Sequence, residues 1–138
     1  MMNSMNEEMK KFIRNYSLQT YNSDYNVICD LTYKYPISKS ISRKYVRQLR
    51  DYLNKYDIFC DGILVFEYSR EMKQLHNHIL MYNKNEKFYK VNGMIYNFWK
   101  KIGYSTIREY DSSQNYSEYV CKYINLTDNR NWDFISNL

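Results

Sequence analysis

The sequence contains little glycine, proline or cysteine. Its 138 residues include 3 glycines, 1 proline and 3 cysteines. So few turn-forming residues argue against flexible linkers and against a sandwich of many tight turns. The cysteines, at Cys29, Cys60 and Cys121, lie far apart and form no Cys-x-x-Cys pair. We therefore expect buried free thiols, because neither a disulfide framework nor a zinc ribbon has the spacing it needs.

Long apolar runs are also missing. No segment approaches the length of a membrane span, and the N-terminal stretch carries Glu7 and Glu8 where a signal peptide would have its apolar core. With 44% hydrophobic residues, a chain of this length can bury the core of one domain. We expect a soluble, cytoplasmic, single-domain protein that makes no membrane contact.

Positive charge and tyrosine are abundant. The formal net charge is +5, and 17 of the residues are tyrosine. Neutralising phosphates releases counterions, so the charge favours a polyanionic partner. Lysines and arginines near one predicted helix could mark the path of a nucleic acid, although a solvated basic helix is the more ordinary meaning of such a run. These residues are Lys34, Lys39, Arg43, Lys44 and Arg47.

Hydrophobic periodicity predicts an α+β fold with a central antiparallel sheet and helices packed on it. A short helix over Met5–Asn15 falls in an N-terminal extension, residues 1–25. The β-α-β-β-α-β-α order that follows is typical of a ferredoxin-like arrangement. The expected elements are strands over 26–33, 58–69, 75–83 and 104–110 and helices over 41–56, 90–103 and 112–126.

The helix over 41–56 has a predicted cap and a predicted buried face. Ser38 or Ser40 can cap its N-terminus. Apolar residues then recur at helical spacing, which predicts the side that packs against the sheet. They are Ile41, Tyr45, Leu49 and Leu53, with Tyr52 as an alternative to the last.

The only two histidines, His76 and His78, are one residue apart in the segment LHNHIL. On a strand they share a face, about 7 Å apart, while Asn77 points the other way. If the connecting loop is symmetric, the hairpin pairs Glu67 with His76 and Val65 with His78, which adds Glu67 to the histidine face. Two imidazoles and a carboxylate suit a divalent metal with open positions, so we expect Mn²⁺ or Mg²⁺. An exposed or packed histidine pair is the alternative.

The predicted helix over 112–126 carries a tyrosine and lysine face. Tyr116, Tyr119, Lys122 and Tyr123 cluster on one side of a helical wheel. A tyrosine with a lysine one turn later is a sensible nucleophile pair, because the cation favours the phenolate and screens an incoming phosphate. Amphipathic packing is the ordinary explanation for any one of these tyrosines.

Taken together, three segments resemble the motifs of the HUH endonuclease superfamily, in particular the rolling-circle replication initiators (Rep proteins). The segment Ile28–Tyr33 resembles the first-strand motif, with Cys29 and Asp30 in place of the common pattern. LHNHIL resembles the His-hydrophobe-His motif, with Asn77 in the middle. YVCKY, Tyr119–Tyr123, is similar to the Tyr-x-x-Lys motif. The resemblance covers residues 26–126, a nicking domain, and leaves 127–138 as a C-terminal tail.

The resemblance implies a metal-dependent enzyme that nicks and rejoins single-stranded DNA at an origin. Glu67, His76 and His78 carry over as metal ligands, Tyr119 as nucleophile and Lys122 as the phosphate contact, while Tyr123 fits the offset of a second nucleophile. The reaction leaves a 5′-phosphotyrosyl enzyme and a free 3′-hydroxyl. No Gly-x-x-x-x-Gly-Lys motif is present, so the resemblance is to small phage, archaeal-virus or plasmid Rep proteins, which depend on host replication machinery and a helicase. If the gene is viral, the expected compartment is the host cytoplasm.

Two other functions stay open on the sequence. A single-tyrosine transposase of the IS200/IS605 type uses the same histidine pair and tyrosine helix, but typically takes its third ligand from that helix. A non-catalytic module could bind single-stranded nucleic acid through tyrosine stacking and lysine contacts alone. The origin sequence, which can include a hairpin, and assembly as a homodimer are likewise undecided.

Overall fold

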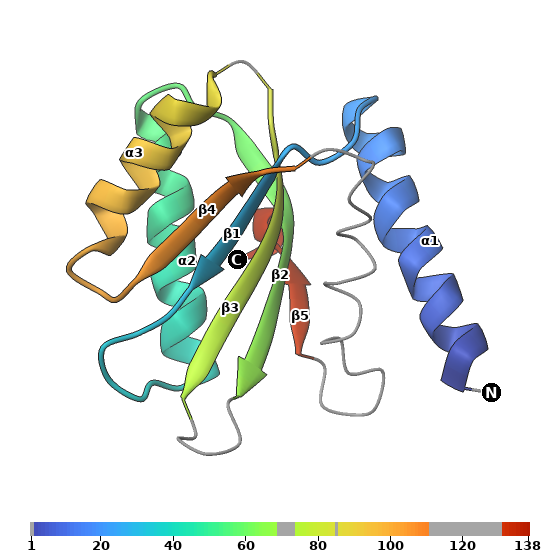
Figure 1. The fold of residues 1–138 in the computed structure, drawn as a ribbon, viewed down its shortest axis with the longest axis horizontal. Coiled ribbons are helices and arrows are strands. Elements are labelled where there is room, and N and C mark those ends of the chain that lie inside the picture. The colour runs from blue at the N-terminus through green and yellow to red at the C-terminus, as the bar shows by residue number, and fades with distance from the viewer. Residues whose placement is uncertain (1, 69–73, 85, 111–130) are drawn as a thin grey trace.

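The computed structural model describes residues 2–68, 74–84, 86–110 and 131–138, with side chains from residue 7 onward. A five-stranded sheet forms its centre, with helices on both faces (Figure 1). The helices are α1 (Met2–Tyr21), α2 (Lys39–Lys55) and α3 (Phe88–Trp99), followed near the end by a short 3-10 helix, η2 (Ile135–Asn137). The strands are β1 (Val27–Leu31), β2 (Cys60–Tyr68), β3 (Leu75–Asn83), β4 (Ser105–Glu109) and β5 (Trp132–Phe134).

Every strand pairing in the described sheet is antiparallel, in the order β4-β1-β3-β2-β5. The α+β fold with an antiparallel sheet is therefore confirmed. The predicted hairpin is also confirmed, because β2 pairs with β3 in the register that sets Glu67 opposite His76 and Val65 opposite His78. The predicted helix over 112–126 lies outside the described residues.

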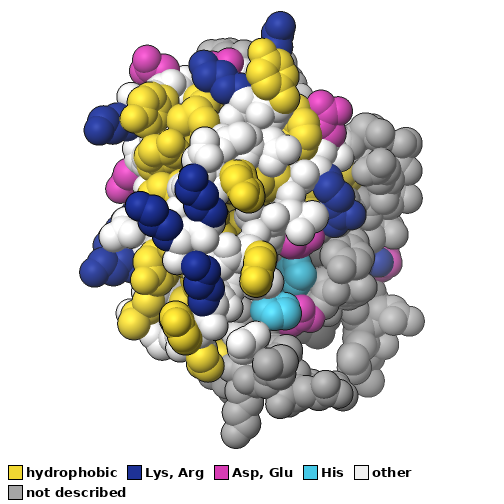
Figure 2. Space-filling model, turned by 60° about the vertical axis from the view of Figure 1, so that its left-hand side comes forward, with side chains coloured by type: hydrophobic (Ala, Val, Ile, Leu, Met, Phe, Trp, Pro, Cys, Tyr) yellow, Lys and Arg dark blue, Asp and Glu magenta, His cyan; other side chains and the backbone are white. Residues whose placement is uncertain are grey.

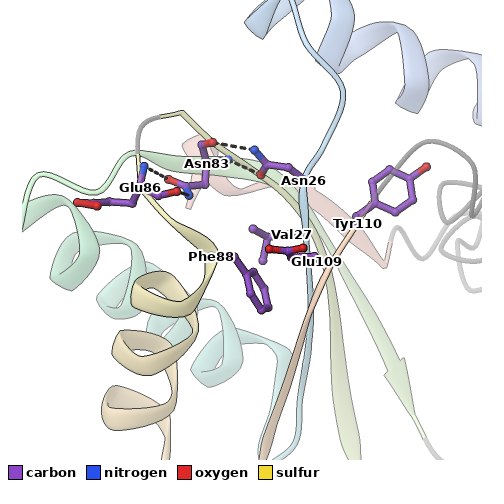
Figure 3. Close-up of a pocket in the computed structure, with 7 residues that line it drawn as sticks. All are labelled: Asn26, Val27, Asn83, Glu86, Phe88, Glu109 and Tyr110. Atoms are coloured by element: carbon purple, nitrogen blue, oxygen red, sulfur yellow. Dashed lines mark hydrogen bonds between the residues drawn. The ribbon is translucent and has the colours of Figure 1, made fainter.

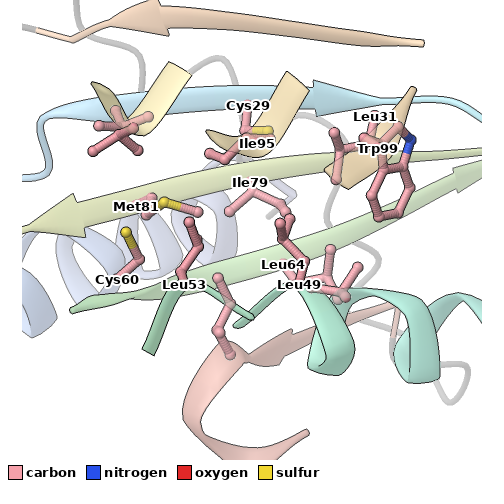
Figure 4. Close-up of a cluster of buried hydrophobic side chains, with 14 of the residues drawn as sticks. Cys29, Leu31, Leu49, Leu53, Cys60, Leu64, Ile79, Met81, Ile95 and Trp99 are labelled. Atoms are coloured by element: carbon pink, nitrogen blue, oxygen red, sulfur yellow. The ribbon is translucent and has the colours of Figure 1, made fainter. Parts of the chain in front are cut away.

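The larger core lies between the sheet and helices α2 and α3. Apolar side chains of β1, β2 and β3 meet those of the two helices, and the indole of Trp99 is fully buried among them (Figure 4). The Trp99 Nε1–H donates to the main-chain oxygen of Thr32 at 2.8 Å, so this large ring also ties α3 to the segment after β1. Burial of a ring this size stabilises the fold by roughly 2–3 kcal/mol.

Helix α2 begins where one of the two predicted caps stands. Ser38 is the N-cap, and its hydroxyl accepts from the Ile41 main-chain N–H at 3.2 Å. The buried face differs from the expected one, because Ile41 is 47% exposed and Ser42 and Val46 are buried instead, together with Leu49 and Leu53. Ser42 is drawn inward by hydrogen bonds to polar groups under the sheet, which turns Ile41 outward.

A second, smaller core lies on the opposite face, under α1. Ile13 of α1 is fully buried against β1, β2 and β3, and the Tyr25 hydroxyl donates to the Ile13 main-chain oxygen at 2.7 Å. The N-terminal helix is longer than the expected 5–15 segment, running from Met2 to Tyr21, and it forms part of the packed structure.

The chain end adds a strand that the periodicity does not predict. Within 127–138, expected as a tail, Trp132–Phe134 pairs with β2 and Ile135 enters the larger core. A three-residue strand is too short to show an alternation of its own. Its pairing covers the outer edge of β2, so the hairpin that carries Glu67 is supported on both sides.

Candidate functional site

The histidines lie on the α1 side of the sheet, near the end where β3 begins. The register aligns Asp30 of β1 with His78, and Glu67 of β2 with His76. Alternation along the strands puts all four side chains on one face. Figure 2 shows both histidines side by side at the surface, with acidic side chains next to them. The predicted meeting of Glu67 with the histidine row is therefore present in the register.

His78 is held by a carboxylate at each ring nitrogen. Its Nδ1 lies 2.7 Å from Asp30 Oδ1, and its Nε2 lies 3.0 Å from Glu67 Oε1. The ring is nearly enclosed, with a side chain 9% exposed, whereas the two carboxylates are about one-third exposed. A doubly protonated imidazolium would donate to both neighbours at once.

The surroundings of His78 push its pKa in opposite directions. Burial of the ring is the largest single influence and lowers the pKa, because the charged form loses hydration. Hydrogen bonds and charge from Asp30 and Glu67 act the other way and together outweigh burial. The pKa of His78 is therefore raised above its ordinary value.

Asp30 was not among the site residues predicted from sequence, and it completes the geometry. Its Oδ1 faces His78, while its Oδ2 accepts from the Arg108 guanidinium of β4 at 3.2 Å. A signal for it existed, since Asp30 is the only charged residue in the strand VICDL. A histidine that binds a metal commonly donates its second ring nitrogen to a carboxylate, which fixes the tautomer and the ring orientation.

The donor set of this face fits a divalent cation in its chemistry. The His78 Nε2 and the Glu67 carboxylate already face each other, and Asp30 holds the far side of the ring. His76 takes part in no hydrogen bond or ion pair among the described residues, although it stands opposite Glu67 in the register. Within 2–68, 74–84, 86–110 and 131–138, no three acidic, histidine or cysteine side chains are arranged to hold a metal ion.

Asn77, between the two histidines, points to the other face as predicted. It is fully buried, and its Oδ1 accepts from the hydroxyls of Tyr33 and Ser42. Its Nδ2 has no hydrogen-bond partner in the described part of the chain. This contact joins β3 to the segment after β1 and to α2 directly beneath the histidines, so Asn77 holds the strand in place from behind.

The basic residues suggested for a nucleic-acid path do not all remain available. Arg43 forms an ion pair with Asp133 of β5 at 2.5 Å and lies over the ring of Phe66, so its charge is used within the fold. Lys44 and Arg47 are exposed on α2. Lys34 is exposed in the segment that follows β1.

A hollow of about 300 Å³ lies at the far end of the sheet from His76. Asn26 and Asn83 bridge β1 and β3 there, and Asn83 also donates to the Glu86 main-chain oxygen (Figure 3). The charged side chains among the described residues that line it are the carboxylates of Glu86 and Glu109. An acidic hollow whose amides bond each other is unsuited to a phosphate, so we assign it no part in the site.

The remaining predicted site residues, Tyr119, Lys122 and Tyr123, lie outside the described residues, as do Glu71 and Cys121. The other two cysteines, Cys29 and Cys60, are buried free thiols, as expected. No helix in the described part of the chain combines the length and apolarity that crossing a membrane requires.

Comparison with known proteins agrees with these observations. A family model for replication-associated proteins of the ORF2 type matches residues 20–128, which is most of the chain and includes both histidines. Searches among curated proteins and among solved structures return no match. The chain therefore belongs to this replication-associated protein family, a family of rolling-circle replication initiators.

Proposed function

We propose that this protein starts replication by nicking and rejoining single-stranded DNA at an origin. Family membership supports the replication role, and the observation that carries the chemistry is the row of Asp30, His78 and Glu67. An imidazole oriented on one side by a carboxylate and facing a second carboxylate on the other is suited to a metal that acts on phosphate.

The proposed covalent step uses Tyr119. Its phenolic oxygen forms a bond to phosphorus as the bond from phosphorus to the 3′ oxygen breaks, which leaves a 5′-phosphotyrosyl link and a free 3′-hydroxyl. Rejoining is the reverse, with the 3′-hydroxyl as nucleophile and the phenolate leaving. Lys122, one helical turn on if that segment is helical, would contact the phosphate and favour the phenolate. Tyr123 would serve as a second nucleophile.

The proposed metal ligands are Glu67, His76 and His78, with Mn²⁺ or Mg²⁺ as the ion. A bound cation would supply charge stabilisation at the scissile phosphate. The protein's own contribution is positioning. Asp30 holds the His78 ring with its Nε2 toward Glu67, and pairing of β2 with β3 brings Glu67 opposite His76. A preset arrangement of this kind lowers the entropic cost of reaching the reactive geometry.

The proposed partners follow from the reaction. Origin DNA must be presented as a single strand, so a host helicase and host polymerase would act on the same molecule, starting from the free 3′-hydroxyl. The family match supports initiation over transposition of the IS200/IS605 type. DNA context decides between them, because an origin hairpin near the gene indicates replication and paired subterminal hairpins flanking it indicate transposition.

The test is formation of a covalent adduct with labelled, origin-derived single strands in Mn²⁺. We expect the wild type to give a denaturant-resistant adduct, Tyr119→Phe to give none while still binding DNA, and Tyr123→Phe to show whether one or two tyrosines react. His76→Ala and His78→Ala should each abolish cleavage. Full cleavage by either variant would remove that histidine from the site, and strand binding without any wild-type adduct would indicate a non-catalytic binding module.

A further inference from the structure

Two segments meet at the end of the sheet that carries His76. One follows β1 and the other joins α3 to β4. The main-chain N–H of Thr32 donates to the Tyr104 oxygen at 2.9 Å, and that of Lys34 donates to the Ile102 oxygen at 3.0 Å. We call residues 32–35 and 100–104 the junction. Gly103 permits this contact, because a Cβ there would fall 2.0 Å from the Thr32 oxygen.

The junction exposes tyrosines and lysines together. Tyr35 is 76% exposed and Tyr104 is 79% exposed, the two largest exposures among the described large hydrophobic side chains. Three exposed lysines accompany them, Lys34, Lys100 and Lys101. Neither segment contains an acidic residue, and none of these lysines forms an ion pair with a described residue.

The strand register connects the junction to the histidine row. Leu31 is paired with Asn77 on one side and with Ser105 on the other. One residue further along, Thr32 falls between His76 and Tyr104. Because neighbouring strands are about 4.8 Å apart, the Tyr104 backbone lies about 10 Å from that of His76.

Edge strand β4 continues the same surface. Tyr104, Thr106 and Arg108 alternate along it and are all exposed. Arg108 bonds Asp30, which itself contacts His78, so this side of β4 belongs to the histidine face. Figure 2 looks toward the α3 and β4 side and shows lysine and arginine side chains among hydrophobic ones, with the histidines on the same visible face.

We propose that the junction is a binding surface for the single-stranded DNA that passes the histidine row, with Tyr35 and Tyr104 stacking on unpaired bases and Lys34, Lys100 and Lys101 contacting phosphates. The assignment rests on the proposed function for its substrate and adds the place of contact. Exposed aromatic rings favour a single strand, because the bases of a duplex are already stacked on each other. Lysines without acidic neighbours complement the phosphate charge.

The experiment measures fluorescence anisotropy of labelled oligothymidylate in chelator, so that binding is read without cleavage. Replacing Tyr35 and Tyr104 by alanine should weaken binding roughly 5- to 100-fold per stacked base. Tyr104→Phe, which keeps the ring, should bind as the wild type does. Replacing the three lysines by glutamine should lower the slope of log affinity against log salt by about 2.

A matched control is available at the other end of α3. Tyr89 is 72% exposed at the start of the helix, roughly 15 Å from its last turn, and Tyr89→Ala should leave affinity unchanged. Equal affinities for Tyr104→Ala and Tyr89→Ala would overturn the proposal, as would an equal loss of binding to a blunt duplex. Loss confined to single strands, in a protein that forms no adduct, would refute the nicking function and leave the surface standing.

Discussion

Removal of the Asp30 carboxylate should loosen His78 without disrupting the fold. Asp30→Ala takes away the acceptor 2.7 Å from His78 Nδ1 and the partner of Arg108. A hydrogen bond to a charged group contributes about 1.5–3 kcal/mol to the free energy of unfolding. Because the Asp30 side chain is 27% exposed and water can replace part of the contact, we expect a loss near the lower end, about 1.5 kcal/mol. The exposed Arg108 pair adds little.

The same change should affect metal binding more than it affects stability. Loss of a carboxylate that orients a ligating histidine typically costs about 10- to 100-fold in metal affinity. Asp30→Asn keeps an acceptor oxygen in the same place, so it should recover part of both losses. A purely structural role for Asp30 would reduce stability and leave the Mn²⁺ affinity of the folded protein unchanged.

The assay is simple because the chain has only two histidines. Nitrogen NMR of the imidazole rings should show His78 protonated at Nδ1 in the wild type and in Asp30→Asn, with His76→Gln assigning the signals. In Asp30→Ala the His78 ring should lose that preference, and calorimetric titration with Mn²⁺ should show the weaker affinity. Unchanged ring signals together with unchanged Mn²⁺ affinity would refute the positioning role of Asp30.

Two further predictions concern the scaffold. Gly103→Ala should destabilise the fold by about 1–3 kcal/mol in urea titration, because its Cβ would overlap a main-chain oxygen, whereas Gly93→Ala, which meets nothing within 4 Å in the middle of α3, should stabilise it by about 0.5–1 kcal/mol; equal effects would contradict the close approach. Burial raises the pKa of Cys60 to about 12 and that of Cys29 further, so peptide mapping after alkylation at mildly alkaline pH should find both thiols unmodified until denaturant is added, and rapid native labelling of either would count against this packing.

The hairpin was predictable from sequence because two local rules agree. A short polar loop between two apolar runs sets the register, and alternation then decides which residues share a face. The result, Glu67 opposite His76, depends on nothing outside residues 58–83. The same locality explains why β3, from Leu75 to Asn83, matches its predicted bounds.

Features that depend on distant contacts were not predictable in this way. Ser42 is buried at the expense of Ile41 because Tyr33 and Asn77 offer it hydrogen bonds, and hydrophobic periodicity does not register a buried polar group. Asp30 contacts a histidine 48 residues away. Without the pairing of β1 with β3, its charge indicates only an interrupted apolar strand.

The measurement that tests the central claim most directly is identification of the residue that becomes linked to DNA. A single strand labelled at its 3′ end would be incubated with the protein and Mn²⁺, and the labelled protein would be digested and mapped by mass spectrometry. The account predicts that the label stays on the protein, since the linkage is to the 5′ phosphate of the downstream fragment, and that the modified peptide carries it on Tyr119. Release of the 3′-labelled fragment as free DNA, or modification at any residue other than Tyr119 and Tyr123, would contradict the account.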